Sequence, residues 1–539
     1  MKISNKMDDS LLAVRDINHK YIVVDWRKLE MNMKMNLLLV TPTSVSVELQ
    51  NEDAYTTASY EVFLNGAAKG RQNLNSFTLY DLQPGTDYSL QVKGIDGSET
   101  LSFSTTARKE QIYHSALEGG IEDATASIQQ AIDALKPDEF LTIQGCYRVT
   151  ALFLRDNLFL HLPEGSRLLG ETDRTKFPIL SANEEKNGIV LGTWEGHEDD
   201  SFASILTGIG VKNVCVYGKG IVDCQAQESD WWENHRVKRI ARRPKGIFLH
   251  TCENVTLEGI TVCNTPSWNQ HPFYSKNLKY LNLKLLNPAN SPTTDGIDPE
   301  SCDNVLIVGT RISVGDDCIA IKSGKLGFAR KYRTPSSHIT VRNCLMEYGH
   351  AGVTIGSENS GGVKDVLVTN CLFRMTDRGL RIKSQRGRGN LAVIEGITFR
   401  NITMEDVKSP FVINAFYKAG NDEMDERFIR TPLPVSDLTP RFLDFCFENI
   451  RCQDVSYGVG FFLGLPESML GRVTLKNISI SYKEDAQAGE MAMTAWKETF
   501  CKAGFVCENL EELVLDNVTF DTPPSEKFIF RNVNHLREI

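Results

Sequence analysis

Short apolar strands, each opened by a polar turn residue, recur along most of this chain. Clear copies lie at Asn254–Leu257, Asn277–Tyr280, Asn304–Ile307 and His338–Val341, within a series that runs from residue 213 to residue 515. A strand repeated at the length of one coil cannot bury its inner face alone, so the coils must stack. The pattern predicts an all-β fold in which about ten coils build a parallel β-helix.

One amphipathic helix comes before these repeats. Between Ala124 and Leu135, Ile128 and Ile132 follow helical spacing, and Asp123 is the expected N-cap. No comparable helical pattern follows for hundreds of residues. We therefore expect this helix to cap the open end of the strand array, which would otherwise expose strand edges.

A different pattern covers residues 35–108, where short alternating strands and turn residues predict a small β-sandwich. The expected strands are Ser44–Leu49, Ser59–Leu64, Ser89–Val92 and Leu101–Ser104. The segment Leu79–Tyr88 resembles the fibronectin type III signature, in which the Leu packs in the core and the Tyr makes a corner hydrogen bond. Such modules are usually supports. The predicted domains are an extension (1–34), in which Ile22–Val24 could add a strand, the sandwich (35–108) and the β-helix (109–539).

The composition is that of a soluble globular protein, with 41% hydrophobic and 24% charged residues. A formal net charge of −10 argues against a nucleic-acid or membrane-surface partner. No apolar run reaches the roughly 18 residues of a membrane-spanning helix. Charged residues interrupt the N-terminus, so no secretory signal is expected. These features favour a cytoplasmic protein, or a periplasmic or secreted one if a signal was trimmed, and leave the oligomeric state open.

All 13 cysteines lie at or after Cys146, and an odd count favours reduced thiols. Cys302, Cys344 and Cys371 stand beside repeat asparagines and are expected to stack in the core. No cluster has zinc-ligand spacing, so no metal and no other cofactor is expected. Four Asn-x-Ser/Thr sequons belong to the repeats and are expected to be buried turn and strand positions: Asn254, Asn401, Asn477 and Asn517.

Polar clusters beside the predicted strands are the candidates for chemistry. Asp295 precedes Asp316 by 21 residues, about one short coil, so the two can stack on one face of adjacent turns. His350 follows Asp317 by 33 residues, and Lys383 follows His350 by another 33. Strand neighbours normally point to opposite sides. Asp316 and Asp317 can therefore share a cleft only at a bend, which the preceding glycine makes plausible.

This set of residue types suits the cleavage of an acidic sugar. Inverting glycoside hydrolysis needs a carboxylic acid that protonates the leaving oxygen and a carboxylate that activates water. Crowded carboxylates raise one another's proton affinity, so one can stay protonated while the others are ionised. Arg and Lys are the side chains expected to hold a uronate carboxylate. A lone Asp-Asp pair is usually a solvated turn, but its recurrence with a histidine and two cations favours a site.

The motifs resemble those of the polygalacturonase family, glycoside hydrolase family 28, over about residues 110–530. Their order and approximate spacing agree, and the matching strings are Thr294–Asp298, Gly315–Gly324, Gly349–Ser357 and Arg381–Lys383, with Ser267–Asn269 and His271–Pro272 one coil upstream. The resemblance implies a right-handed parallel β-helix and hydrolysis of α-1,4-linked galacturonate with inversion. It implies that Asp316 is the general acid, Asp295 and Asp317 position and deprotonate the water, His350 supports the acid, and Arg381 and Lys383 hold a substrate carboxylate.

Two departures and several weaker candidates accompany this match. Thr293 stands where the family has Asn, and Ala351 where it has Gly, which puts subsite preference in doubt. Lys322 and Tyr417 are further candidates for substrate contact, although a cation beside a turn is often only solvated and Tyr417 is equally well a wall aromatic. The same reservation applies to two arginines that follow the last motif, Arg386 and Arg388.

The basic and aromatic stretch Trp231–Arg243 is too long for a plain coil turn. It is either an ordinary surface loop or a wall that closes one end of the cleft. A closed end favours exo-cleavage of a galacturonate-containing oligosaccharide, the expected partner. A rhamnogalacturonan or xylogalacturonan hydrolase, a calcium-dependent pectate lyase and a non-catalytic carbohydrate-binding β-helix remain as alternatives.

Overall fold

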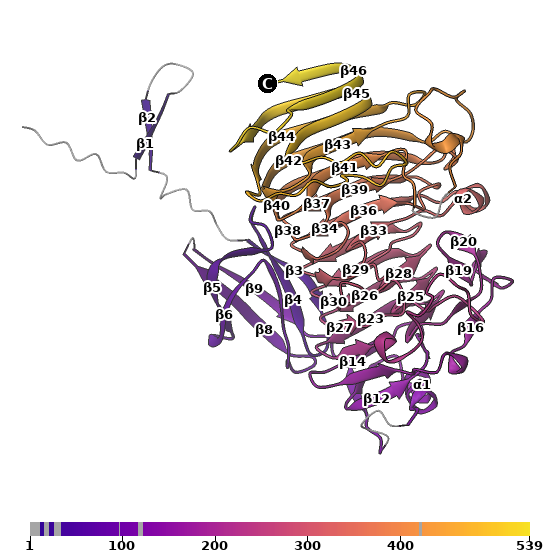
Figure 1. Cartoon of the computed structure of the whole chain (residues 1–539). Helices are drawn as coiled ribbons and strands as arrows, with labels where there is room; N and C mark the ends of the chain where they lie inside the picture. The colour runs from indigo at the N-terminus through magenta and orange to yellow at the C-terminus, as the bar shows by residue number, and fades with distance from the viewer. Residues whose placement is uncertain (1–10, 16–20, 26–33, 96, 117–121, 420–422) are drawn as a thin grey trace, which may run out of the picture.

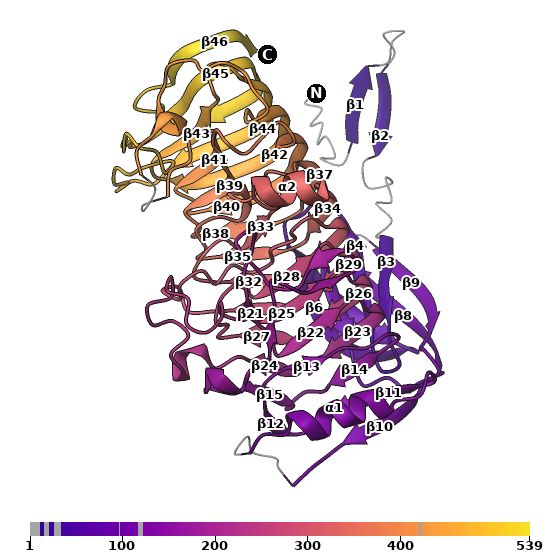
Figure 2. The ribbon, with the colours of Figure 1, turned by 90° about the vertical axis from the view of Figure 1, so that its right-hand side faces the viewer.

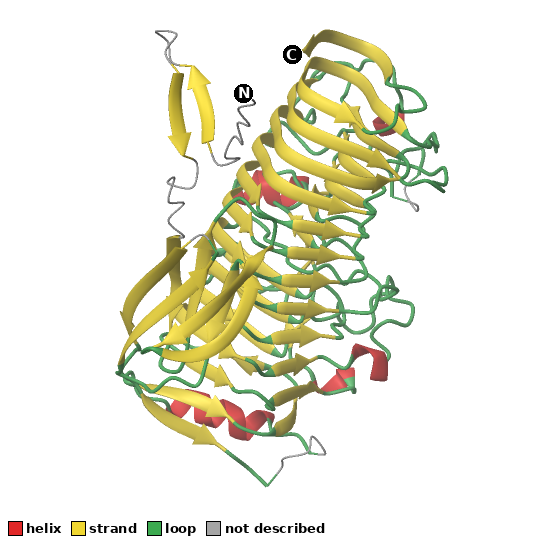
Figure 3. Cartoon of the chain, turned by 90° about the vertical axis from the view of Figure 1, so that its left-hand side faces the viewer, coloured by secondary structure: helices red, strands yellow, loops and turns green. Residues whose placement is uncertain are grey.

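The computed structural model describes residues 11–15, 21–25, 34–95, 97–116, 122–419 and 423–539. Within them, most strands pair in parallel and coil by coil into a long solenoid (Figure 1). The predicted all-β fold with a parallel β-helix is confirmed. Figure 3 shows these strands in yellow, stacked along the length of the molecule, with green loops concentrated along one edge.

Three stacks of strands form the faces of the solenoid. The first stack contains β10 (Lys109–Tyr113), β11 (Glu139–Ile143), β14 (Phe159–Leu162), β23 (Lys212–Gly218), β26 (Glu253–Glu258), β29 (Lys276–Leu281), β31 (Asp303–Val308), β34 (Ser336–Arg342), β37 (Val363–Thr369), β40 (Val393–Glu405), β42 (Arg441–Val455), β44 (Leu470–Tyr482), β45 (Ala503–Phe520) and β46 (Phe528–Glu538). The second contains β12 (Cys146–Val149), β15 (Arg167–Gly170), β24 (Ile221–Asp223), β27 (Thr261–Cys263), β30 (Lys284–Leu286), β32 (Arg311–Ser313), β35 (Leu345–Glu347) and β38 (Leu372–Arg374).

The third stack carries the candidate site. It contains β13 (Leu152–Phe153), β22 (Leu206–Ile209), β25 (Ile247–His250), β28 (Gln270–Phe273), β33 (Ile319–Ile321), β36 (Val353–Gly356), β39 (Arg378–Lys383), β41 (Ser409–Asn414) and β43 (Gly458–Leu463). Bridges from Ile297 to Gln270 and to Ile319 make this stack continuous between β28 and β33. Three short hairpins leave the coils: β16 (Ile179–Leu180) with β21 (Ser201–Phe202), β17 (Glu185–Lys186) with β18 (Ile189–Val190), and β19 (Thr193–Trp194) with β20 (His197–Glu198).

One apolar core runs along the inside of the coils. Inward side chains such as Val255, Leu278 and Val305 stack coil upon coil. Cys302 and Cys344 are buried in the same core, as predicted. Burying side chains at successive turns stabilises the stack because each coil removes apolar surface of its neighbour from water.

Two helices flank the coils. The first, α1 (Thr125–Ala134), buries Ile128 and Ile132 in the core and lies across the end of the solenoid below β14 (Figure 2). Its N-cap is Ala124 and not Asp123, whose Oδ1 accepts a hydrogen bond from the Thr125 backbone N–H at 2.8 Å. The second, α2 (Leu326–Tyr332), was not predicted because only Phe328 and Ala329 face inward, too few for a helical pattern. No helix in the described ranges is both long and apolar enough to span a bilayer.

Before the solenoid lie two antiparallel sheets that share a core. One contains β3 (Lys34–Val40), β4 (Val45–Gln50) and β7 (Ser76–Leu79), and the other β5 (Thr56–Leu64), β6 (Ala67–Leu74), β8 (Asp87–Gly94) and β9 (Gly97–Ser104). Leu82 is buried between them, and the Tyr88 hydroxyl accepts a hydrogen bond from the Gln83 N–H at 2.9 Å. The fibronectin type III identity stays a prediction. In the N-terminal extension, Ile22–Val24 lies in β2 (Tyr21–Asp25), which pairs with β1 (Leu11–Arg15).

Candidate active site

Strand register in the third stack decides which side chains meet. The bridge between Ile297 and Ile319 aligns Asp295 with Asp317, and not with Asp316 as the 21-residue spacing predicts. The pairing of Ile319 with Val353 aligns Asp316 with His350. Coil lengths in this stack differ by several residues, so spacing in the sequence does not give the register alone.

Asp316 and Asp317 do lie at a bend, between β32 and β33. The bend sends both carboxylates toward the site, although only Asp316 is partly exposed and Asp317 is fully buried. Gly315 does not supply a left-handed backbone conformation here. It is needed because a Cβ at this position would collide with the carbonyl oxygen of Ser291.

Asp317 is held by two cations. Arg381 Nη1 donates to one carboxylate oxygen at 3.1 Å, and Lys383 Nζ donates to the other at 2.6 Å. Burial alone would raise the pKa of Asp317, but Lys383 and Arg381 outweigh it and hold the pKa far below its usual range. Asp317 is therefore an ionised group whose basicity is low.

Asp316 is paired with a histidine. The Nδ1 atom of His350 lies 3.1 Å from Asp316 Oδ1, and the His350 backbone N–H donates to the carbonyl oxygen of Asp316 at 3.0 Å. This hydrogen bond raises the pKa of His350, against the opposing effect of burial. Burial also opposes ionisation of Asp316, yet the contact with His350 leaves the Asp316 pKa below its ordinary value. Each group of this pair thus favours the charged form of the other.

Asp295 has the opposite surroundings. Burial and the neighbouring carboxylates of Asp298 and Asp316 raise the pKa of Asp295 well above its usual range, and Lys322, with its Nζ at 3.7 Å, only partly counteracts them. Oxygens of Asp295, Asp316 and Asp317 lie within 4.8 Å of one another. Groups this close titrate as one system. Of the three, Asp295 is therefore the carboxyl group whose surroundings most favour the protonated form.

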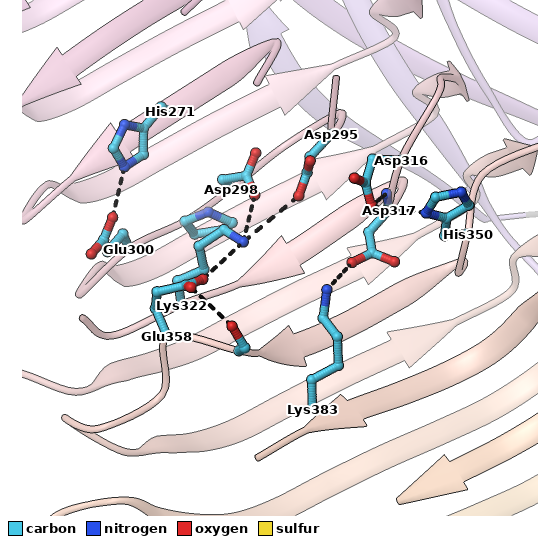
Figure 4. A network of polar contacts seen from close by, with 12 residues as sticks. His271, Asp295, Asp298, Glu300, Asp316, Asp317, Lys322, His350, Glu358 and Lys383 are labelled. Atoms are coloured by element: carbon cyan, nitrogen blue, oxygen red, sulfur yellow. Dashed lines mark hydrogen bonds and ion pairs between the residues drawn. The ribbon is translucent and has the colours of Figure 1, made fainter. Parts of the chain in front are cut away.

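Further buried charges lie beside these residues (Figure 4). Lys322 Nζ is 3.3 Å from Asp298 and 3.4 Å from Glu358, and these carboxylates hold the Lys322 pKa well above normal although burial lowers it. His271 Nε2 lies 2.9 Å from Glu300. Burial raises the Glu300 pKa to about 8 and lowers that of His271, so this pair is neutral at pH 7.

Three close carboxylates could also ligate a divalent cation. In this site, however, Arg381 and Lys383 already occupy both oxygens of Asp317. The donor set that remains is Asp295 and Asp316, which is sparse for a cation that takes six or more oxygens. The arrangement fits acid–base chemistry better than metal binding.

A cavity of about 630 Å³ opens beside the carboxylates. Asp295, Asp316, Lys322, Lys383 and Tyr417 line it, whereas the buried Asp317 and Arg381 and the exposed His350 do not. Among the described lining residues, eight are Lys or Arg and five are Asp or Glu. A cationic cavity in a chain of net charge −10 favours an anionic ligand.

The stretch Trp231–Arg243 forms part of this cavity. Trp231 is buried edge-on against Phe177 and Phe202, which anchors the loop, while Arg236 and Arg242 line the cavity farther along. The Arg242 guanidinium lies 5.8 Å from the ring centre of Trp194, whose indole stands 6.2 Å from that of Trp268 at 9°, and both rings also line the cavity. The loop is a cavity wall and not only a surface loop.

The weaker candidates for substrate contact differ in whether they reach the cavity. Arg388 lines the cavity, but Arg386 is buried and donates to both oxygens of Glu467, at 2.6 and 2.9 Å, so it serves the protein itself. Lys383 Nζ lies 5.8 Å from the Tyr417 ring centre. Thr293 accepts a hydrogen bond from Arg243 Nη2 at 2.6 Å and has a left-handed φ of 55°, a conformation that the Asn of the family adopts more readily.

Sequence reasoning gave no role to Asp298, Glu300 and Glu358. Asp298 and Glu300 are two residues apart and follow the core residue Ile297. Strand alternation therefore places both on the face away from the core, where the site lies. Glu358 follows β36 in a loop and gives no such signal. Burial of these carboxylates beside Lys322 is a property of the stacked coils and not of any local pattern.

Comparisons with known proteins agree with this geometry. Residues 160–495 match the family described as Glycosyl hydrolases family 28. A probable polygalacturonase of Vitis vinifera is 31% identical over 344 residues, 63% of this chain and 65% of that protein. An endo-polygalacturonase of Pectobacterium parmentieri is 29% identical over 377 residues, 66% of this chain and 84% of that protein.

A solved structure supports the fold. The family 28 exopolygalacturonase of Yersinia enterocolitica is similar with a TM-score of 0.68 at 19% identity, over 94% of this chain and 98% of that one. The chain spans just under two thirds of the length of the grapevine relative. The family match covers more than half of the chain and includes the three clustered aspartates. This chain belongs to glycosyl hydrolase family 28.

Proposed function

We propose that this protein hydrolyses α-1,4 linkages between galacturonate units of pectic oligosaccharides. The observation that carries the proposal is the trio Asp295, Asp316 and Asp317, whose oxygens lie within 4.8 Å of one another at a cationic cavity. A lyase or a binding solenoid has no need for a carboxyl group that is paired with a histidine and adjoins two further carboxyl groups. The family's polygalacturonases point to the same substrate.

The roles follow from the surroundings of each carboxylate. Asp316 lies at the cavity wall in contact with His350 and is the group placed to protonate the leaving oxygen. Asp317 is locked as an anion by two cations and orients the water. Asp295 is the more basic carboxylate and takes the proton from that water.

The acidic sugar is matched by the cations of the cavity. Lys383 faces the cavity while it pairs with Asp317, so its ammonium can also meet a uronate carboxylate. Arg236 and Lys325 line the cavity and make no ion pair with a carboxylate of the described residues. Charge-assisted contacts of this kind favour a free carboxylate over its methyl ester.

Cleavage from a chain end is the mode that the walls favour. The loop Trp231–Arg243 and the hairpin of β19 and β20 both contribute residues to the lining. Gly196, at the tip of that hairpin, packs so closely on Lys325 and Glu358 that a Cβ would clash. A cavity enclosed by two such segments suits the end of an oligosaccharide better than the middle of a polymer.

The direct test is incubation with digalacturonate and trigalacturonate, with and without a chelator. We expect release of monomer that is unaffected by the chelator. An unsaturated product that absorbs ultraviolet light would show a lyase, and binding without turnover would show a carbohydrate-binding solenoid. Oligomers as sole products of polygalacturonate would contradict cleavage from chain ends.

Stereochemistry is a separate measurement. Inverting glycosidases typically hold two carboxyl groups about 6.5–9.5 Å apart, whereas the nearest oxygens of this trio lie within 4.8 Å. We expect inversion because a third carboxylate is available to orient the water without becoming a nucleophile. NMR of the first product anomer decides this, and a retained configuration would contradict the roles given to Asp295 and Asp317.

Replacing the proposed acid is the sharpest single-residue test. Asp316→Asn is expected to lower kcat by roughly 10²–10⁴-fold, because the leaving oxygen loses its proton donor, while trisaccharide binding persists. Activity and calorimetric binding measure the two effects. Asp303→Asn, an exposed aspartate on the first stack that also contacts a histidine, is the matched control. Near-normal activity of Asp316→Asn would overturn the assignment.

A further inference from the structure

Lys322 is a single cation among three carboxylates, and all four side chains are buried. Its Nζ lies 3.3 Å from Asp298, 3.4 Å from Glu358 and 3.7 Å from Asp295. The Trp268 ring covers it, with the ring centre 4.5 Å from Nζ. Lys322 is 3% exposed. One ammonium cannot neutralise three carboxylates, so the balance among them depends on where protons sit.

The two sides of the catalytic trio are unequally supplied with cations. Asp317 has Arg381 and Lys383 to itself, one on each oxygen. Asp295 shares Lys322 with two other carboxylates and is the most distant of the three. Neither oxygen of Asp298 accepts a hydrogen bond from a described residue. Asp298 is nonetheless the carboxylate nearest to Lys322, and its own charge opposes the ionisation of Asp295 on the same coil.

These contacts bear on the path of one proton. Hydrolysis starts when Asp316 passes a proton to the leaving oxygen and ends when Asp295 receives one from water. The C–O bond to the leaving sugar breaks, and a C–O bond to the water oxygen forms. The product state therefore has its proton on Asp295, the carboxyl group of the trio whose surroundings most favour the protonated form. Before the next cycle the proton must move from Asp295 to Asp316.

We propose that Lys322 and Asp298 are positioning residues that govern this transfer, with Lys322 favouring ionised Asp295 and Asp298 opposing it. The proposal rests on the proposed function and adds a device that sets the proton of the site. The titratable and charged groups that face this pair come from five segments: Asp295, Asp298 and Glu300 from one, Asp316 and Asp317 from the next coil, and Glu358, Lys383 and Lys245 from three others.

The two residues predict opposite effects on pH dependence. In Lys322→Met, Asp295 loses its cation and holds the proton more firmly. We expect kcat to fall about tenfold for each unit by which the pKa of Asp295 rises. The high-pH limb of the kcat/KM profile should not move to lower pH. In Asp298→Asn, a repelling anion is lost and the high-pH limb moves to lower pH. Lys322→Arg keeps the charge and is expected to restore the wild-type profile in large part.

Thermal unfolding tests the same placement without any turnover. From pH 5 to pH 8 the buried carboxylates ionise. Over this range the Tm of Lys322→Met should fall more than the Tm of the wild type, whereas the Tm of Asp298→Asn should fall less. Circular dichroism at pH 5 checks that each variant is folded. The proposal would be overturned if each variant differed from the wild type in Tm by the same amount at pH 5 and at pH 8. It would also be overturned if the high-pH limbs of the two variants' kcat/KM profiles moved in the same direction. Absence of turnover by the wild type would instead count against the proposed function alone.

Discussion

At the scale of single residues, two neighbouring aspartates have different surroundings. Asp317 is buried against Arg381 and Lys383, whereas Asp316 faces the cavity with His350 beside it. The bend after β32 turns both toward the site, but the coil that each one meets is different. The difference in basicity comes from neighbouring coils and not from the Asp-Asp sequence itself.

His350 provides a prediction at this scale. Its raised pKa means that the imidazolium persists to a higher pH than usual, so its support of Asp316 is complete at low pH and is lost as pH rises through the raised pKa. His350→Gln is expected to lower kcat/KM by about 10–100-fold below that pKa, the worth of a hydrogen bond to a charged group. Above it, the gap to the wild type should narrow.

The measurement is a pH profile of kcat/KM from pH 4 to pH 8 for both proteins. His338→Gln is the control, because His338 makes a similar contact of 2.7 Å to Asp303 outside the site. A deficit in His350→Gln that stays constant across the range would show that the charge of His350 is irrelevant.

Much of the site could be predicted from the sequence because its motifs combine charged residues with strand ends. Asp295, Asp316, Lys383 and Tyr417, all candidates from the sequence, line the cavity. Their roles stay predictions. Lys322 was considered only as a substrate contact, and its burial among three carboxylates was not foreseen. That burial depends on register between coils of unequal length, which no single coil encodes.

At the scale of elements, asparagines at the coil turns hold successive strands in step. Asn213, Asn254, Asn277 and Asn304 all have left-handed φ angles between 55° and 57°. Their side chains hydrogen bond from one coil to the next, as from Asn254 Nδ2 to Asn213 Oδ1 at 3.1 Å. Asparagine suits both tasks, because it tolerates this conformation and both donates and accepts.

The sequon asparagines belong to this ladder, and the prediction that they are buried was wrong. Asn254, Asn477 and Asn517 are exposed, and Asn401 is half-buried. A buried position was expected because the strand that follows each asparagine is apolar. The asparagine itself lies within the strand, at a residue of left-handed φ, where its side chain does not enter the core. Pattern reasoning located the repeat correctly and misjudged the face.

Asn449 tests the ladder, because it is a middle rung. It donates to Asn401 at 3.1 Å and accepts from Asn477 at 3.0 Å, with φ at 55°. Asn449→Ala loses both bonds and places Ala in the left-handed region, at a cost of roughly 2–3 kcal/mol of unfolding free energy. Asn449→Gly loses the same bonds but adopts the left-handed φ without strain, so it should cost roughly 1 kcal/mol of unfolding free energy. Denaturant unfolding of both variants measures this, and equal losses would exclude a contribution from backbone conformation.

At the scale of the whole molecule, the β-sandwich of β3–β9 packs on the turns between the first and second stacks (Figure 3). Arg342 donates to both oxygens of Glu48, at 2.6 and 2.9 Å, and Thr78 and Tyr80 each donate to Glu258 Oε1 at 2.7 Å. No described residue of the sandwich lines the cavity. Its contacts support the solenoid along several coils, which fits the role of a buttress.

Glu258 makes this junction sensitive to pH. Burial raises its pKa to about 7. A carboxyl group whose pKa is raised on folding stabilises the protein below its ordinary pKa, and the contribution is lost as pH rises toward the raised value. From pH 4.5 to pH 7 this loss amounts to roughly 3 kcal/mol. Glu258→Gln should therefore lose less Tm than the wild type between pH 5 and pH 8.

The control is Glu253→Gln, five residues earlier on β26, where Glu253 pairs with Lys212 and Lys276 at the surface. Scanning calorimetry at both pH values compares the three proteins. If Glu258→Gln follows the wild type at every pH, Glu258 does not titrate at the junction.

The contacts between the sandwich and the solenoid restrict how the protein can change in evolution. The sandwich meets the solenoid at Glu258, Asn282, Gly309, Asn343 and Asn370, one position on each of five successive coils. A sandwich transplanted from another protein would need groups that match the solenoid on all five of these coils. A coil inserted or deleted within this stretch would break the match at every later contact. The two parts are therefore expected to be inherited as a pair and to resist recombination between them, while the coils beyond Asn370 are free to vary in number.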